Sequence, residues 1–170
     1  MNCLPKTTRR QRPNGFTLME LLIVIAIMLI LMLIAIPNFN RIKITANESS
    51  AIKSLQVIAT AQGQYSSLFT ANGYSCTLPA LGGDPSKGNP TPQLAELIPD
   101  SLASGVKDGY TFTMTCTKQT VGSTDNVTGF TVNAVPLAVG KTGNRGFCID
   151  QFSQVKSDPT GGTNCTQSMQ

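Results

Sequence analysis

Residues 15–36, GFTLMELLIVIAIMLILMLIAI, decide the fold of this chain, because from Phe16 onward they are almost wholly apolar and hold one charged residue, Glu20. About 21 residues at about 1.5 Å each give a helix of roughly 31 Å, which matches the hydrocarbon thickness of a bilayer. A carboxylate within such a helix costs about 2.5–3.5 kcal/mol near the bilayer centre and less near its edge. We therefore predict a membrane-spanning helix over 16–37, in which Glu20 pairs with a positive group of a neighbouring subunit.

The stretch before this segment, MNCLPKTTRRQRPNG (1–15), is basic and contains no acid. Its charges hold that end in the cytoplasm by the positive-inside rule. The whole chain has 13 Lys+Arg and 9 Asp+Glu, so removal of the four basic residues of this stretch leaves a formally neutral protein, and we predict no nucleic-acid partner. An ordinary secretory signal is excluded, because the apolar segment is too long and no small-residue cleavage site follows it. A plain signal anchor remains an alternative.

The motif GFTLMELLIVIAI resembles the amino terminus of type IV prepilins and of type II secretion pseudopilins. The resemblance implies that a prepilin peptidase cuts after Gly15 and then methylates the new terminal amine on Phe16. The glutamate that the family places four residues after the cut is Glu20, and the family's helix-breaking proline is Pro37. Met19 departs mildly from the pattern, since the family more often has Ile, Leu or Val there.

In a filament of such subunits, the terminal amine of Phe16 would approach Glu20 of the next copy and replace two costly charges by one ion pair. The alternative is that Glu20 reaches the headgroups from its own helix. Pro37 lacks an amide hydrogen, so we expect a kink or a loosened turn there. A simple marker of the membrane exit is the other reading of this proline.

The segment 38–70 is predicted to continue the helix with an amphipathic pattern. Asn72-Gly73 is a natural helix stop. Spacings near 3 and 4 place on the inner face Phe39, Ile42, Ala46, Ala51, Leu55, Ile58, Gln62, Tyr65 and Phe69. The polar face carries Arg41, Lys43, Asn47, Glu48, Lys53 and Gln56.

Residues 71–170 are predicted to form the globular head, with loops over 75–90 and a short helix that opens at Thr91-Pro92 and ends at Pro99. Leu94, Leu97 and Ile98 should face inward from that helix. Alternating apolar residues predict strands over 110–117, 129–135 and 145–150, and a fourth short strand over 152–156. The expected fold class is therefore α+β, with the long amino-terminal helix packed on a small antiparallel sheet in a pilin-like arrangement.

Four cysteines, Cys76, Cys116, Cys148 and Cys165, lie in the part expected outside the cytoplasm, while Cys3 lies in the leader. Disulfides are allowed there, and three pairings are possible. We favour Cys148–Cys165, which closes a carboxy-terminal loop like the one that many pilins carry, and Cys76–Cys116, which ties the first loop to the sheet. A four-thiolate zinc site is the alternative, but the chain has no Cys-x-x-Cys spacing.

Catalytic chemistry is not predicted for this chain. It contains no histidine, which excludes Ser-His-Asp and Cys-His catalysis and removes the commonest metal ligand. Asp150 and Asp158 flank a glycine-rich tail, and the resemblance raises a calcium site there, because some pseudopilins bind calcium near their carboxy terminus. Two acids without a third at loop spacing favour a solvated surface instead. We therefore expect a protein that is not an enzyme, with no cofactor and no bound metal.

The resemblance implies a structural pilin that is inserted in the bacterial inner membrane, processed, and polymerised by the pilus assembly machinery into an extracellular homo-oligomeric filament. A pseudopilin of a type II secretion system, forming a short periplasmic filament, is the closest alternative. A membrane-anchored binding module that never polymerises is the alternative from another class. It predicts an uncut amino terminus and no dependence on Glu20.

Overall fold

The computed structural model describes residues 15–83, 86, 88–121 and 124–169, and the side chains of 34–38, 120, 121, 124 and 125 are also outside the description. The expected leader therefore lies outside the described residues except for Gly15. The chain divides into two compact units, Met1–Phe39 and Asn40–Gln170, each of which is described by itself.

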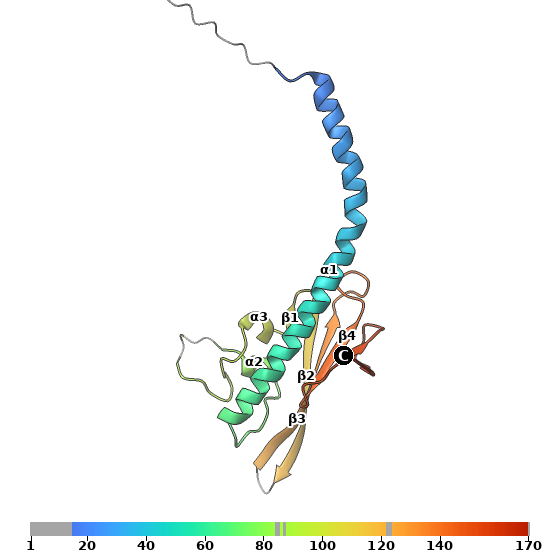
Figure 1. Cartoon of the computed structure of the whole chain (residues 1–170). Coiled ribbons are helices and arrows are strands. Elements are labelled where there is room, and N and C mark those ends of the chain that lie inside the picture. The colour runs from blue at the N-terminus through green and yellow to red at the C-terminus, as the bar shows by residue number, and fades with distance from the viewer. Residues whose placement is uncertain (1–14, 84–85, 87, 122–123, 170) are drawn as a thin grey trace, which may run out of the picture. The chain divides into compact units, whose positions relative to one another are not determined.

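Helix α1, Leu18–Leu68, has 51 residues and belongs to both units (Figure 1). It ends four residues before Asn72-Gly73, and Gly73 has the positive φ of 73° that glycine allows. No helix within the described residues is both long enough and apolar enough to cross a membrane, so the predicted span over 16–37 is not confirmed.

The second unit is built on a six-stranded antiparallel sheet in which the strands follow one another in chain order. The second half of α1 lies across one face of this sheet (Figure 1). The predicted α+β class, a long helix on an antiparallel sheet, is confirmed. The strands are β1 (Val106–Lys107), β2 (Tyr110–Val121), β3 (Thr124–Pro136), β4 (Gly146–Asp150), β5 (Val155–Asp158) and β6 (Gln167–Ser168).

The core of this unit forms where one stripe of α1 meets the sheet. Ala51, Leu55 and Ile58 recur at helical spacing and are at most 1% exposed. The sheet supplies Tyr110, Val132, Phe147 and Ile149 from the facing side of β2, β3 and β4. The inner face predicted for α1 is wrong in its first part, because Phe39, Ile42 and Ala46 are exposed.

The short helix predicted from Thr91-Pro92 to Pro99 is absent, and two four-residue helices flank that segment instead: α2 (Leu78–Leu81), inside the predicted loop, and α3 (Asp100–Ala103). Glu96 has a positive φ of 58°, which an α-helix does not accept. Pro99 therefore caps the start of α3 rather than ending a helix. The amides that a helix would use donate to the end of α2 at 2.7–3.0 Å: Ala95 to Ala80, Glu96 to Gly82, and Leu97 and Ile98 to Leu81.

The three main predicted strands correspond to β2, β3 and β4, and the first two are longer than predicted. The fourth strand starts at Val155 rather than at residue 152. Asp150 holds a turn there, because its side chain accepts from the amide of Phe152 at 3.0 Å and its carbonyl accepts from the amide of Ser153 at 2.9 Å. The two-residue strands β1 and β6 are too short to leave a periodic signal in the sequence.

Phe147 tests the core. Its side chain is fully buried, so Phe147→Ala should lower the free energy of unfolding by about 3–5 kcal/mol. Phe152→Ala is the matched control, because Phe152 is 73% exposed and its loss should change stability by no more than about 0.5 kcal/mol. Urea unfolding in detergent, followed by tyrosine fluorescence, measures both. Equal losses for the two variants would contradict the assigned core.

Candidate functional site

The predicted processing junction between Gly15 and Phe16 is exposed. A Cβ on Gly15 would meet no described atom within 4 Å, and Phe16 is 83% exposed. Both residues precede the first turn of α1. A peptide bond in an uncovered, non-helical stretch is accessible to a peptidase.

Glu20 lies in the first turn of α1, where its side chain caps the N-terminus of the helix. Its Oε2 accepts from the backbone amide and from the hydroxyl of Thr17, both at 2.9 Å. In return, the Thr17 hydroxyl oxygen accepts from the amide of Glu20 at 3.2 Å. This reciprocal pattern is a capping box, which satisfies two of the free amides at a helix start.

The sequence analysis missed the capping box although the signal was present. Thr17-Leu18-Met19-Glu20 has the Thr-x-x-Glu spacing of that motif, directly before an apolar run. The carboxylate therefore already has partners within its own chain. Its other oxygen, Oε1, has no hydrogen bond within the described part of the chain.

The first unit leaves its apolar surface uncovered. Exposed fractions run from 83% at Leu18 to 47% at Val24 and 75% at Leu33. Contiguous apolar surface of this extent marks a site that a partner or a membrane covers. Pro37 lies within α1, but its side chain is outside those described, so the predicted kink stays a prediction.

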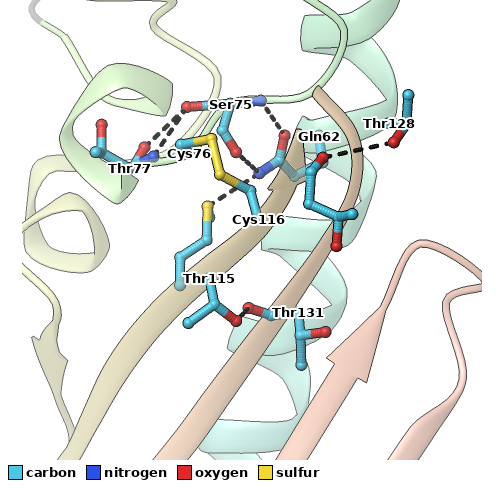
Figure 2. The surroundings of a disulfide bond; sticks show 10 residues. Gln62, Ser75, Cys76, Thr77, Thr115, Cys116, Thr128 and Thr131 are labelled. Atoms are coloured by element: carbon cyan, nitrogen blue, oxygen red, sulfur yellow. Dashed lines mark hydrogen bonds between the residues drawn. A yellow bond between two sulfur atoms is a disulfide. The ribbon is translucent and has the colours of Figure 1, made fainter. Parts of the chain in front are cut away.

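Two disulfides tie the head together, and they are the two pairs that the sequence analysis favours. Cys76–Cys116 joins the loop before α2 to β2, with a Cα–Cα distance of 5.5 Å (Figure 2). Cys148–Cys165 joins β4 to the carboxy-terminal segment, with a Cα–Cα distance of 6.0 Å. Each cross-link of this kind stabilises a fold by roughly 3 kcal/mol, mainly by limiting the unfolded chain.

Gln62 is a polar residue inside the core beside the first disulfide. Its Nε2 donates to the carbonyl of Ser75, and its Oε1 accepts from the amide of Ser75, both at 2.8 Å (Figure 2). The side chain is fully buried. The two hydrogen bonds hold the loop that carries Cys76 against α1. The predicted inner position of Gln62 is confirmed by its burial, and the helical spacing alone did not show its hydrogen bonds.

Glu48 is a second buried polar anchor on α1, and its predicted place on the polar face is wrong. It is only 6% exposed. Its carboxylate accepts from the guanidinium of Arg145 at 2.7 and 3.0 Å and from the amides of Asn144 and Arg145 at 2.9 and 3.2 Å. The Arg145 carbonyl in turn accepts from the hydroxyl of Tyr110 at 2.9 Å, and burial is the main cause that raises the pKa of this phenol.

Asp158 organises the loop that Cys148–Cys165 closes. Its Oδ1 accepts from the hydroxyl and the amide of Thr160 at 2.7 and 2.9 Å, and its Oδ2 accepts from the amide of Asn164 at 2.9 Å. Asp158 is 4% exposed, so the expected solvated surface is wrong for this residue. Within the described residues no group of three or more Cys, Asp or Glu side chains could hold a metal ion.

Comparison with known proteins gives two findings on this chain. The family described as the prokaryotic N-terminal methylation motif matches residues 10–36. The type IV major pilin protein PilA of Myxococcus xanthus (strain DK1622) is 41% identical over 78 residues, which are 46% of this chain and 34% of that protein. These two findings support a similarity of this chain to type IV prepilins. The chain spans about a third of the length of that relative. No solved structure gives a significant match.

Glu48 supplies a test of how the globular head is held on α1. Glu48→Ala leaves the guanidinium and two amides without their acceptor, so the free energy of unfolding should fall by about 3 kcal/mol. The loss should stay at the low end of the range for buried pairs, because the Arg145 side chain is 43% exposed and can be rehydrated. Lys53→Ala, at an exposed site on the same helix, is the control and should change stability by no more than about 0.5 kcal/mol. Urea unfolding measures both. A Glu48→Ala protein as stable as its control would refute the anchor.

Asp158 predicts how stability depends on pH. The hydroxyl and the amide of Thr160, and then the amide of Asn164, hold the pKa of this carboxyl below its ordinary value of 3.8. Folding then favours the charged form, so the stabilisation is complete above the ordinary pKa and is lost as the pH falls through the lowered one. The difference in unfolding midpoint between wild type and Asp158→Asn should be largest at neutral pH and should shrink below about pH 3.8. A difference that does not change with pH would contradict this role, and Asp100→Asn, at an exposed position, is the control.

Proposed function

We propose that this chain is a structural pilin subunit that is cut after Gly15, methylated on Phe16 and polymerised through its amino-terminal helix into a type IV pilus-like filament. The single observation that supports this most is the methylation motif at 10–36, with its junction, acid and apolar run. The relative is named a type IV major pilin protein, which favours a pilus over a type II secretion pseudopilus.

Before assembly, the apolar segment 16–37 anchors the subunit in the bacterial inner membrane, with the leader in the cytoplasm and the head on the other side. A prepilin peptidase and methyltransferase acts on the exposed junction at Gly15 and Phe16. After assembly by the pilus machinery, the same apolar surface lies in the centre of an extracellular homo-oligomeric filament. Pro37 loosens α1 at the end of this segment, because it removes one backbone hydrogen bond.

The capping box gives a specific form to the contact between subunits. Cleavage creates an ammonium on Phe16, next to Thr17. In the filament this ammonium pairs with Oε1 of Glu20 in the adjacent copy, while Oε2 keeps its two bonds to Thr17 of its own chain. Such a pair offsets the burial of two charges and fixes the axial register more than it adds stability.

Two substitutions at Glu20 separate the charge from the cap. Glu20→Gln keeps the capping box, because Gln also fits its last position, but removes the negative charge. Glu20→Ala removes both. We expect each variant to enter the membrane and lose its leader, and each to form far fewer filaments than wild type. Shear preparation of filaments measures the yield, and mass spectrometry of the mature amino terminus measures processing.

The outcomes distinguish the parts of the proposal. Filament yield at the wild-type level for Glu20→Gln would refute the charge pair and leave the cap as the function of Glu20. A wild-type protein that still starts at Met1, or that starts with an unmethylated Phe16, would refute the processing route. A processed protein confined to short periplasmic filaments would favour the pseudopilin.

A further inference from the structure

We propose that the head of one subunit docks on the head of the next, with the loop 137–142 between β3 and β4 seated in a groove along the second half of α1. This inference rests on the proposed function, because it names a contact between the heads of a filament whose subunits also associate through their amino-terminal helices. The loop and the groove both belong to the second unit of the chain. The occupant of the groove is thus a second copy of this chain.

The groove follows the solvent side of α1. Two hollows of about 640 and 540 Å³ lie there, and they share Thr60, Gln64 and Leu97, so they form one continuous groove. Leu68 and Val57 line its two parts and are 60% and 45% exposed, while Leu97 is half-buried. Apolar side chains that line a concave surface favour a partner with exposed apolar side chains of its own.

The loop between β3 and β4 presents such side chains on a fixed support. Leu137 and Val139 are each 59% exposed. The Thr142 hydroxyl accepts from the amide of Ala138 at 3.1 Å and donates to the carbonyl of Ala138 at 3.2 Å. The Thr142 carbonyl accepts from Nδ2 of Asn47, on α1, at 2.8 Å. A loop that is ordered before it binds loses little conformational freedom on binding.

The charges of the two surfaces are complementary. Lys141 of the loop is exposed and forms no ion pair within the part of the chain that the structure describes. Glu96 and Asp100 flank Leu97 in the sequence. Among the described acidic side chains of the second unit, these two are the ones without a hydrogen bond or an ion pair. Lys53 lines the first end of the groove and repels Lys141, which orients the loop with its cation toward the acids.

The loop and the groove lie at different heights along α1. Asn47 binds the loop, and Thr60, which lines both hollows, follows Asn47 by about 20 Å along the helix axis. A contact between two different surfaces is heterologous, so it produces a ring or an open filament rather than a closed dimer. Because the two surfaces are displaced along α1, each contact shifts the next head along that helix, which suits a filament.

Cross-links in sheared filaments test the contact. Val139→Cys and Thr60→Cys together place one thiol on the loop and one in the groove. A short bismaleimide should then join successive subunits into a ladder of covalent dimers, trimers and longer oligomers on a denaturing gel. The four native head cysteines do not react, because they are paired in two disulfides.

The controls for the ladder use the same reagent. Each single variant, Val139→Cys or Thr60→Cys, should remain monomeric, because neither surface meets a copy of itself. Phe152→Cys combined with Thr60→Cys is the matched control, since Phe152 is 73% exposed on the turn between β4 and β5. It should give no ladder.

Charge reversal tests the orientation of the loop in the groove. In the Val139→Cys and Thr60→Cys background, Lys141→Glu should lower the rate of cross-linking about threefold, because an attraction between exposed charges becomes a repulsion. Adding Glu96→Lys should restore the rate, since the two charges are then exchanged. Lys118→Glu, at an exposed cation of β2, is the control and should leave the rate unchanged.

The outcomes separate this inference from the proposed function. Electron microscopy of the sheared fraction is read first, and a wild-type protein that forms no filaments has failed the proposed function. Filaments without the ladder refute this inference alone and show that another protein, or no partner, covers the groove. Cross-linked dimers of either single variant show a contact between like surfaces and also refute it.

A second measurement decides the case in which the two cysteines themselves prevent assembly. Filament yield is then compared in chains that keep Val139 and Thr60. A yield that falls with Lys141→Glu and recovers with the added Glu96→Lys supports the contact. A yield that Lys141→Glu leaves unchanged refutes it.

Discussion

One carboxylate constrains the amino-terminal half of this protein, since Glu20 is the charged residue of an otherwise apolar helix start. A carboxylate in such surroundings needs partners, and the chain supplies the first of them itself through Thr17. In the proposed function, the capping box accounts for this charge in a lone subunit before any neighbour is present. It also leaves one carboxylate oxygen for a second partner, so in the proposed filament a subunit keeps its own cap when it joins another.

The head, in contrast, contains polar side chains that are buried and whose hydrogen bonds are all satisfied. Glu48, Gln62 and Tyr65 lie on one side of α1 and each bonds to a segment distant in sequence. Within the described residues, no buried side-chain nitrogen or oxygen lacks a hydrogen bond. Buried polar groups that are satisfied in this way select one arrangement of loops over others, because any shift leaves a group unpaired. Together with two disulfides, they compensate for the small core of a short domain.

The sequence was sufficient for the features that depend on local pattern. The long helix, the three main strands and the inner positions Leu55 and Ile58 all follow from periodicity. The sequence pattern did not predict burial where a hydrogen-bonding partner distant in sequence determines it. Glu48 looks like a solvated residue until Arg145 is placed beside it, and Asp158 looks the same until the loop after β5 folds around it. The helix predicted before Pro99 was wrong for a related reason, because the backbone amides of that segment donate to carbonyls at the end of α2 instead of to one another.

The two units therefore differ in how completely their own residues satisfy and cover one another. Within the described residues, the second unit satisfies its buried polar side chains internally. The first unit exposes almost every apolar side chain from Leu18 to Leu33, which costs free energy in water and requires a partner or a lipid phase. A protein that joins a head with satisfied buried polar groups to a helix with an uncovered apolar surface is suited to exchange one apolar environment for another. In the proposed function, those two environments are the bilayer before assembly and the filament centre after it.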